Sequence, residues 1–438
     1  MREKIFLYGV VVLASLSGLL AGFDTGVISG ALLFIDKTFE MTPELSGLLV
    51  SSVSLGAIIG AFINGFFIDK CGRKNILLLA AFIFLVGSVA CSFSQTINQL
   101  IFFRGFLGCA VGIVSFAGPL YLSEISSKDK RGSIVSCYQV AITLGILFSY
   151  LINFSCAGFV YNWRIMLFMG AIPSLILFLG MLFQSDTPRW YVLNGEIDKA
   201  TLVLKKFECC TDVNSELKCI ETTVQASKEK IPFDLNLIKP FVIGIGIMFV
   251  QIATGINAII YYAPTIFKNI GFTSNQDALL ITIFIGVINF LMTFVAIAFV
   301  DKWGRKPLLY IGLSGMLISL LVLSSVFAFN IVSLKFISII ACAVYIISFS
   351  MSLGPIALLL ISEIFPLRYR GQAMSVAIIS NFVFNFIVTF LFPIFLSKLG
   401  GCFTFLIFAI ICILSLLFVH FVVPETKGQS LEEIEDRI

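Results

Sequence analysis

The sequence predicts an all-α integral membrane protein: twelve transmembrane helices in two six-helix bundles, joined by a cytoplasmic helical linker. Composition is the first observation behind this fold class. Of the 438 residues, 59% are hydrophobic and 12% are charged, against roughly 45–50% and 25% in soluble proteins. The second observation is a series of apolar stretches, each about 18 residues or longer and so able to cross a hydrocarbon core of about 30 Å. The third is an internal repeat of charged motifs.

Breaks marked by polar residues, glycine or proline divide the apolar stretches into twelve segments. Signal peptides have an apolar core of about 7–15 residues, so the longer first segment is predicted to be a retained helix. The predicted segments are residues 5–35, 46–68, 76–94, 98–122, 134–155, 163–184, 238–268, 278–300, 307–328, 334–362, 371–397 and 401–423.

One long polar stretch, residues 185–237, separates the sixth segment from the seventh. It contains EIDKATLVLKKF and VNSELKCIETTV, in which apolar residues recur at the three- and four-residue spacing of short amphipathic helices. The chain therefore divides into a first six-helix bundle (1–184), this linker, a second bundle (238–423) and a tail (424–438).

Lysine and arginine residues predict the orientation in the membrane. With a cytoplasmic N-terminus, 23 of the 29 fall on the cytoplasmic side, five fall outside, and Arg104 falls within a helix. Positively charged loops stay in the cytoplasm. Both termini and the linker are therefore predicted to be cytoplasmic, in the plasma membrane or, in a bacterium, the inner membrane.

Charged motifs of the first half recur in the second. IDKCGRKN (68–75) returns as VDKWGRKP (300–307), and SEISSKDKRG (123–132) returns as SEIFPLRYRG (362–371). The offsets are 232 and 239 residues, and each motif has the same place in its half. Two similar six-helix bundles are one architecture in which transporters hold a substrate near the middle of the membrane.

The repeated charges have two interpretations. For a single copy, a topology signal is sufficient. Because the motifs recur with their acid–base pairs, Glu124 with Arg131 and Glu363 with Arg370, we hypothesise clusters that hold the halves together in one conformation and break in the other. Surface ion pairs contribute only about 0–1 kcal/mol each, which suits a reversible contact. The predicted cytoplasmic gating network comprises Asp69, Arg73, Glu124, Arg131, Asp301, Arg305, Glu363 and Arg370.

Asp24 lies in the stretch AGFDTGVISG (21–30), which is otherwise apolar or small apart from hydroxyl side chains. A charge at mid-membrane costs about 2.5–3.5 kcal/mol on insertion scales, so such residues are rare and usually functional. Arg104 is the only lysine or arginine well inside a predicted helix, and we expect it to meet Asp24 in the outer half of the first bundle. A nearby arginine favours the ionised carboxylate and desolvation favours the protonated acid. If the two residues separate during a conformational change, Asp24 can carry a proton; the alternative is an ion pair that only fixes the packing.

Uncharged polar side chains within the membrane segments are candidates for a substrate site. Asn257 and Tyr261 are four residues apart, as are Asn381 and Asn385, so each pair shares a helix face. Thr254-Gly255 predicts a break in the seventh helix, an irregularity that membrane proteins tolerate where it lines a cavity. For each residue alone, a hydrogen bond to a neighbouring helix is the alternative. The candidates are Gln139, Gln251, Asn257, Tyr261, Asn289, Asn381 and Asn385.

Several motifs together resemble the sugar porter family of the major facilitator superfamily. They are GFDTGVISG, the two DKxGRK loops, the two SE…RG motifs, GINAIIYYAP (255–264), GPIALLLISEIFP (354–366) and PETKG (424–428). The resemblance covers about residues 8 to 428. One departure is QSDTPRW (184–190), where the family usually has Pro-Glu-Ser-Pro-Arg; Asp186 and Arg189 keep the charges, so we expect the role to be kept.

The resemblance implies import of a monosaccharide or cyclic polyol by proton symport, with alternating access between the two halves. Asp24 matches the proton-carrying aspartate of proton-coupled sugar porters, and Arg104 matches its partner. Four of the candidates fall on sugar-binding positions: Gln139, Gln251, Asn257 and Asn289.

Other site positions depart from the family. The chain has Ile146 and Ile252 where sugar porters often have glutamine, and Leu358 where they have tryptophan. A Gln-Trp pair is replaced by Asn381-Phe382. Because an unpartnered buried polar group costs about 1–3 kcal/mol, we expect a substrate with fewer or differently placed hydroxyls; pentose, hexose and polyol all stay open.

Other function classes fit the sequence less well. An enzyme is not predicted, since the single histidine, His420, lies at the end of the last segment, and the GxxxxGK[ST] phosphate loop is absent. A facilitative uniporter is the first alternative, and a sugar sensor is the second. Sodium coupling ranks lower, because no further oxygen ligands are spaced around Asp24. Neither a cofactor nor a metal site nor a nucleic-acid partner is predicted; the expected partners are the sugar, the proton and the bilayer, with the monomer as functional unit.

Overall fold

The computed structural model describes residues 2–127, 130–206, 213–227, 238–329, 335–365 and 370–427. Within these residues, twelve helical spans are long and apolar enough to cross a membrane. This confirms the predicted fold class and the number of segments. Large apolar side chains on the outside, such as Phe66, Phe102 and Phe421 at 70%, 69% and 78% exposure, suit a protein whose surroundings are lipid rather than water.

The first bundle contains the helices of residues 2–182. They are α1 (Arg2–Phe39), α2 (Pro43–Cys71), α3 (Arg73–Phe93), α4 (Ile97–Glu124), α5 (Arg131–Cys156), α6 (Asn162–Phe168) and α7 (Ala171–Leu182). The linker contains α8 (Pro188–Leu193), α9 (Ile197–Lys206) and α10 (Val213–Ser227).

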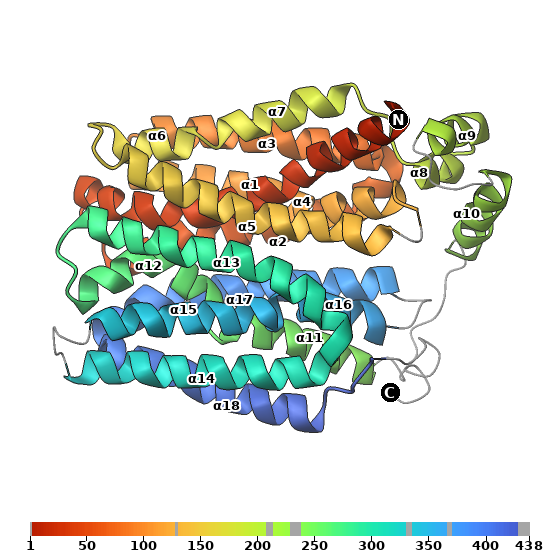
Figure 1. Ribbon diagram of the computed structural model, residues 1–438. Coiled ribbons are helices and arrows are strands. Elements are labelled where there is room, and N and C mark those ends of the chain that lie inside the picture. The colour runs from red at the N-terminus through yellow and green to blue at the C-terminus, as the bar shows by residue number, and fades with distance from the viewer. Residues whose placement is uncertain are drawn as a thin grey trace.

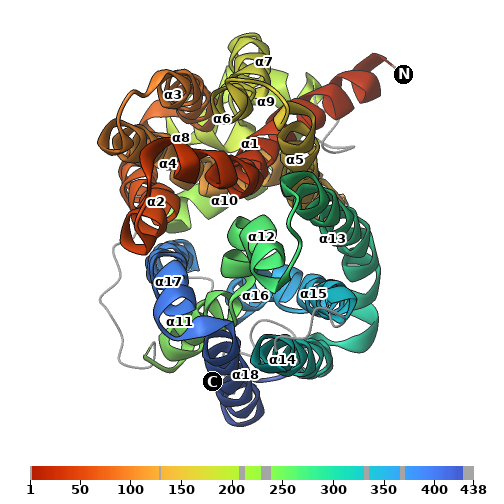
Figure 2. The same cartoon turned by 90° about the vertical axis from the view of Figure 1, so that its left-hand side faces the viewer.

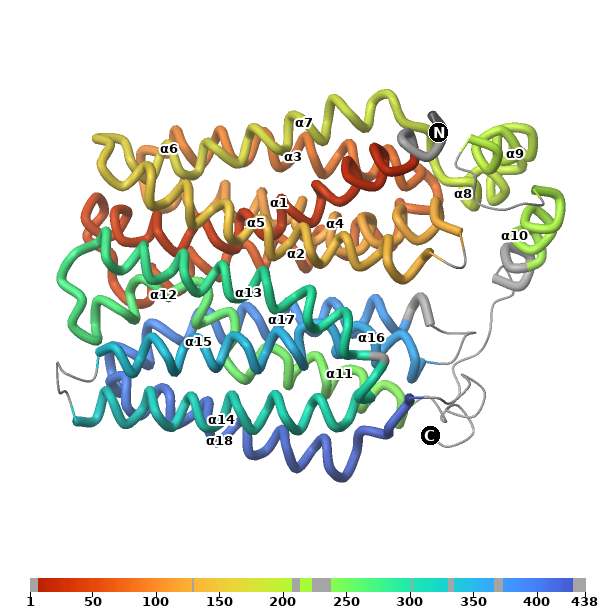
Figure 3. The backbone as a smooth tube through the Cα atoms, in the orientation of Figure 1, coloured from red at the N-terminus to blue at the C-terminus, as the bar shows by residue number. Residues whose placement is uncertain are grey.

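The second bundle follows the linker. Its helices are α11 (Ile238–Ala253), α12 (Ile256–Ile270), α13 (Asn275–Trp303), α14 (Arg305–Phe329), α15 (Lys335–Met351), α16 (Leu353–Ile364), α17 (Arg370–Lys398) and α18 (Gly400–Phe421). The two bundles lie side by side with their helices roughly along one direction, as Figures 1 and 2 show from two sides. We call the end that carries α8–α10, where α1 begins and α18 ends, the linker end, and the opposite end the distal end; the tube in Figure 3 traces the path between them.

Small residues let the helices of the first bundle approach closely. A Cβ atom on Gly22 of α1 would lie 1.9 Å from the Ile142 carbonyl oxygen on α5, and one on Gly56 of α2 would lie 1.8 Å from that of Gly105 on α4. In lipid there is little hydrophobic drive for helices to associate, so van der Waals packing across small residues supplies much of the attraction.

Polar contacts between the bundles run from the distal end to the middle of the spans. At the distal end the Lys398 ammonium lies 3.6 Å from the Glu44 carboxylate. Further in, the Tyr150 hydroxyl donates to the Ile260 carbonyl at 3.2 Å. These contacts join α2 with α17 and α5 with α12, and α5 also packs against α13 of the second bundle.

Two spans of the second bundle are broken. The seventh span changes from α11 to α12 at Thr254-Gly255, where Gly255 has φ +97°, so the break predicted from the sequence is present. The tenth span changes from α15 to α16 at Ser352, which has φ −123° and ψ −92°. Breaks like these leave backbone groups without helical partners, and such groups are tolerated at membrane depth only where other protein groups or a cavity satisfy them.

The linker helices form a small core of their own at the linker end. Val192 on α8 and Ala200 on α9 are buried, and Leu217 and Ile220 of α10 pack on them. Val203 of α9 is buried as part of the core of the first bundle. The two amphipathic helices predicted in the linker are therefore present as α9 and α10.

Candidate functional site

Asp24 and Arg104 meet inside the first bundle. Asp24 on α1 is 3% exposed and Arg104 on α4 is 1% exposed. The two terminal guanidinium nitrogens of Arg104 donate to the two Asp24 carboxylate oxygens at 3.3 and 3.4 Å, and its Nε donates to the Leu49 carbonyl of α2 at 3.2 Å. A buried ion that loses its partner is strongly destabilising, so the charge on each residue depends on the other.

Tyr261 connects this ion pair with the second bundle. It lies on α12 and is 8% exposed. Its hydroxyl lies beside the side chains of Thr25 on α1 and Asn385 on α17, and the charges of Asp24 and Arg104 act on it electrostatically. The residue therefore stands between the ion pair and the amide side chains described next.

Asn257 and Asn385 form the first amide pair. Asn257 Nδ2 donates to Asn385 Oδ1 at 2.9 Å, and Asn385 Nδ2 donates to the Ser54 hydroxyl at 3.0 Å. Ser54 belongs to α2, so this chain of hydrogen bonds crosses from one bundle to the other. Sequence reasoning missed Ser54, although the run SSVS (51–54) is a polar stretch within an apolar segment.

Gln251 and Asn381 form the second amide pair. Asn381 Nδ2 donates to Gln251 Oε1 at 2.9 Å. Gln251 Nε2 donates to the Leu353 carbonyl at 3.1 Å, with the Gly354 carbonyl at 3.5 Å. The amide of Gln251 is thus engaged at both of its ends.

The remaining substrate candidates are placed differently. Asn289 on α13 is 9% exposed, and its Oδ1 accepts from the Ser350 hydroxyl at 2.7 Å. Gln139 lies half-buried on α5, one turn from Thr143, whose hydroxyl accepts from the Thr293 hydroxyl of α13 at 3.3 Å. The structure therefore joins four of the candidates in two amide pairs and leaves Asn289 and Gln139 outside them.

The apolar residues at the departing positions fall into two groups. Ile146 and Ile252 are 5% and 4% exposed and belong to the hydrophobic core. Leu358 is 42% exposed, and Phe382 is half-buried. Two of the positions where sugar porters often have polar side chains are thus closed off by core packing.

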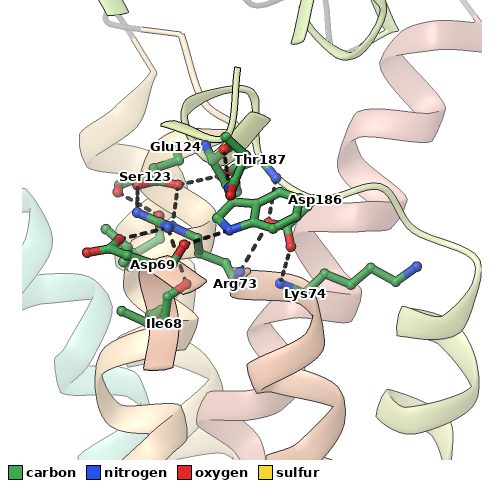
Figure 4. Close-up of polar contacts among 11 residues, drawn as sticks. Ile68, Asp69, Arg73, Lys74, Ser123, Glu124, Asp186 and Thr187 are labelled. Atoms are coloured by element: carbon green, nitrogen blue, oxygen red, sulfur yellow. Dashed lines mark hydrogen bonds and ion pairs between the residues drawn. The ribbon is translucent and has the colours of Figure 1, made fainter. Parts of the chain in front are cut away.

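A second group of functional candidates lies at the linker end of the first bundle (Figure 4). Arg73, at the start of α3, is 3% exposed. Its guanidinium contacts Asp69 at 2.9 Å and Glu124 at 3.0 and 3.1 Å. The second oxygen of Glu124 accepts from the Thr187 hydroxyl at 2.5 Å. We call these residues, with Asp186, the first linker-end cluster.

The second bundle repeats this arrangement. Arg305, at the start of α14, donates to Glu363 at 2.8 Å. The other oxygen of Glu363 accepts from the Thr426 hydroxyl at 2.5 Å. We call these residues, with Glu425, the second linker-end cluster. Nearby, His420 Nδ1 lies 2.9 Å from the Tyr310 hydroxyl.

Asp186 and Glu425 take the same place in the two clusters, as caps of α3 and α14. Asp186 Oδ1 accepts from the N–H groups of Arg73 at 3.1 Å and Thr187 at 2.8 Å, and Oδ2 accepts from Lys74 at 3.1 Å. Because the first N–H groups of a helix lack partners within it, a carboxylate from another segment satisfies them here.

Glu425 binds its helix in the same manner. Its Oε1 accepts from Arg305, Thr426 and Lys427 at 3.0, 3.1 and 3.0 Å, and its Oε2 accepts from Lys306 at 2.9 Å. Neither cap belongs to the predicted gating network, although Asp186 lies in QSDTPRW (184–190) and Glu425 in PETKG (424–428), two of the motifs compared with the family.

The two caps differ in electrostatics. Burial raises the pKa of Asp186 above its ordinary value of 3.8, and the backbone N–H groups and Arg73 only partly offset this. Burial acts in the same direction on Glu425, but its backbone N–H donors outweigh it and hold the pKa of Glu425 below 4.5. The ionised form is therefore favoured at Glu425 and disfavoured at Asp186.

Several residues of the predicted gating network have other partners than expected. Glu124 pairs with Arg73, while Arg131 donates to the Ser123 carbonyl at 3.2 Å; the expected pairing of Glu124 with Arg131 is therefore wrong in this conformation. The side chains of Asp301 and Arg370 lie outside the described part of the structure. The contacts given above for each linker-end cluster stay within one bundle and its adjoining segment.

Comparison with known proteins identifies the family. The family of sugar (and other) transporters matches residues 10–437. The D-xylose transporter of Levilactobacillus brevis is 41% identical over 432 residues, which cover 97% of this chain and 94% of that protein. The galactose-proton symporter of Escherichia coli strain K12 is 37% identical over 441 residues, which cover 99% and 94%. Among solved structures, the inward-open xylose transporter XylE from E. coli has a TM-score of 0.87 at 29% identity, covering 98% of this chain and 99% of that one. The chain therefore belongs to the sugar transporter family of the major facilitator superfamily.

Proposed function

We propose that this protein imports a monosaccharide or cyclic polyol by proton symport. The observation that carries the proposal is the buried pair of Asp24 and Arg104, whose charges act on Tyr261 of the second bundle, while the Tyr261 hydroxyl lies next to Asn385 of the first amide pair. A carboxylate held in this way is one that a proton can neutralise, and its neighbours are side chains that suit sugar hydroxyls.

Proton uptake at Asp24 changes what holds the first bundle together. The ionised carboxylate binds both terminal nitrogens of Arg104; the protonated acid loses most of that attraction. Arg104 is then held by the Leu49 carbonyl alone among the contacts described, so α1 and α4 are freer to shift. With a membrane potential of about 100 mV and about one pH unit, one proton supplies roughly 2.3 and 1.4 kcal/mol, enough for a several-hundred-fold accumulation.

The substrate is expected between the bundles, near the middle of the spans. The two amide pairs offer donors and acceptors that match hydroxyl groups, and the broken helices on either side provide the irregular backbone typical of transporter sites. The relatives named above carry xylose and galactose according to their names, which supports a monosaccharide.

Orientation and gating complete the proposal. Because lysine and arginine are concentrated at the linker end, that end faces the cytoplasm. The linker-end clusters then stabilise the cytoplasmic end of each bundle, so that each bundle moves as a unit while the two rock between conformations that differ by a few kcal/mol.

Uptake into proteoliposomes tests the proposal. The panel comprises labelled xylose, glucose, galactose, arabinose and myo-inositol, each with and without an imposed inward proton gradient. We expect gradient-driven accumulation of one substrate by the wild type, and loss of accumulation in Asp24→Asn with exchange retained. Asp36→Asn is the matched control, since Asp36 lies on the same helix but is exposed.

The runner-up is a facilitative uniporter. In that case the wild type, Asp24→Asn and Asp36→Asn all equilibrate the sugar regardless of the proton gradient, and Asp24 has a structural role. A sugar sensor would bind one of the sugars without transporting it.

A further inference from the structure

The breaks in the second bundle have no counterpart in the same helices of the first. The first and fourth helices of the first bundle, α1 and α4, run unbroken from Arg2 to Phe39 and from Ile97 to Glu124. In the second bundle the corresponding spans change helix at Gly255 and at Ser352. Breaks in these two spans are thus a property of one bundle.

The first break leaves a carbonyl that a side chain from the other span satisfies. Among the described residues, no backbone N–H donates to the Thr254 carbonyl, because Gly255, with its positive φ, turns the chain out of the helix. The Tyr345 hydroxyl, on α15, donates to this carbonyl at 2.9 Å, and Tyr345 is fully buried. An unpaired buried carbonyl is costly, so the hydroxyl stabilises the break.

A second hydrogen bond runs in the opposite direction. Gln251, one turn before the first break, reaches the second break through Nε2, which donates to the carbonyl of Leu353, the first residue of α16. Its Oε1 is held by Asn381. Nε2 carries two N–H donors, and the Leu353 and Gly354 carbonyls lie 3.1 and 3.5 Å from it, so a sugar hydroxyl that accepts from Nε2 competes with these two carbonyls of the second break.

We propose that these two bonds form a reciprocal brace between the broken spans, and that Tyr345 is a positioning residue of the sugar site. Tyr345 holds the α11–α12 break so that Gln251 and Asn257, on either side of it, keep their positions. When sugar binds, Gln251 Nε2 donates to a sugar hydroxyl instead of the Leu353 carbonyl. The hydrogen bond from Tyr345 to the Thr254 carbonyl then remains as the one of the two bonds that still joins the spans. The inference rests on the proposed function, since it takes Gln251 as a sugar ligand.

Removal of a single hydroxyl tests the brace by transport. Tyr345→Phe is compared with Tyr138→Phe, which also deletes a buried hydroxyl, one that donates to the Val114 carbonyl of the unbroken α4 at 3.1 Å. The assay is sugar counterflow, which needs no proton gradient. We expect Tyr345→Phe to raise KM about five- to ten-fold, as for the loss of one net hydrogen bond, with the maximal rate little changed, and Tyr138→Phe to leave KM unchanged.

Hydrogen–deuterium exchange tests the same brace without a sugar. Tyr345→Phe should increase exchange of the amides at 256–259 and also at 353–357, although residue 345 is two turns from the second break; Tyr138→Phe should change neither. Exchange that rises only around residue 345, or an unchanged KM, or an equal rise of KM in both variants, overturns the proposal. If the wild type carries no sugar, the proposed function fails, and the exchange data still decide whether the brace exists.

Discussion

The two helix caps at the linker end allow a matched pair of substitutions, Asp186→Asn and Glu425→Gln. Each substitution turns a carboxylate into an amide, which has one oxygen and one NH2 group. The amide can keep its oxygen at the position that accepts from several backbone N–H groups. The NH2 group then takes the position of the second carboxylate oxygen, where it faces a single backbone N–H. That N–H belongs to Lys74 at 3.1 Å in the first cluster and to Lys306 at 2.9 Å in the second. Both variants therefore leave one unsatisfied donor, at a cost of about 1–3 kcal/mol.

The two variants differ in how much stability the lost carboxylate charge had contributed. Hydrogen bonds to a charged acceptor contribute about 1.5–3 kcal/mol against 0.5–1.5 for a neutral one, and at Glu425 this advantage is kept, since its pKa is lowered. At Asp186 burial of the charge offsets the advantage, since its pKa is raised. We expect a loss of unfolding free energy of about 1 kcal/mol for Asp186→Asn and about 2–3 kcal/mol for Glu425→Gln at pH 7.

The pH dependence has opposite signs. Glu425 stabilises the fold above 4.5, its ordinary pKa, and this contribution disappears as the pH falls through its lower folded-state pKa; the penalty of Glu425→Gln therefore shrinks toward acid pH. Folded Asp186 binds a proton more readily than the unfolded chain does, so wild-type stability from this group rises as the pH falls through its folded-state pKa. The penalty of Asp186→Asn therefore grows toward acid pH.

Denaturation in mixed micelles, followed by tryptophan fluorescence from pH 7 to pH 4, measures both penalties. Asp198→Asn, a change at an exposed acid of α9, is the control and should stay close to the wild type throughout. An Asp186→Asn penalty at pH 7 equal to or larger than that of Glu425→Gln would refute the reasoning, as would pH trends of the same sign.

Two further predictions concern the middle of the spans. Arg104→Met leaves the Asp24 carboxylate buried without a partner and should lower the unfolding free energy by about 3–5 kcal/mol. The double variant with Asp24→Asn should regain about 1–3 kcal/mol of that loss. A double-mutant cycle of unfolding free energies measures this, and additive losses would contradict a direct ion pair. Ser54→Ala removes the acceptor of Asn385 Nδ2 between the bundles. It should raise the rate at which a thiol-reactive probe labels a cysteine introduced at the distal end by about three- to ten-fold, as for the loss of a hydrogen bond of about 1 kcal/mol. The Ser52 hydroxyl bonds within its own helix, so Ser52→Ala should leave this rate unchanged, and equal effects of the two variants would contradict the assignment.

Much of the architecture could be predicted because the length and apolar composition of a membrane helix are visible in one continuous stretch of sequence. Twelve apolar stretches of sufficient length define twelve spans, and Gly255 marked the first break since glycine readily takes a positive φ. The meeting of Asp24 with Arg104 was also predictable, because a charge in the membrane has few possible partners.

Contacts that join distant segments could not be read in the same way. Glu124 pairs with Arg73, 51 residues away in the sequence, whereas Arg131, the partner predicted from its nearness in the sequence, donates to the Ser123 carbonyl. The break at Ser352 was not predicted, although Gly354-Pro355 closely follows it and Pro355 has no N–H to continue the hydrogen bonds of α15.

The positions of the two caps have a consequence for how the protein is made. The carboxylate that caps α3 comes 113 residues after Arg73, and the one that caps α14 comes 120 residues after Arg305. A ribosome must therefore finish all six helices of a bundle before the N–H groups at the start of its third helix gain their carboxylate. A nascent chain that stops before Asp186 or Glu425 would leave the first N–H groups of α3 or α14 without this cap, so the segment after the sixth helix of each bundle completes that bundle.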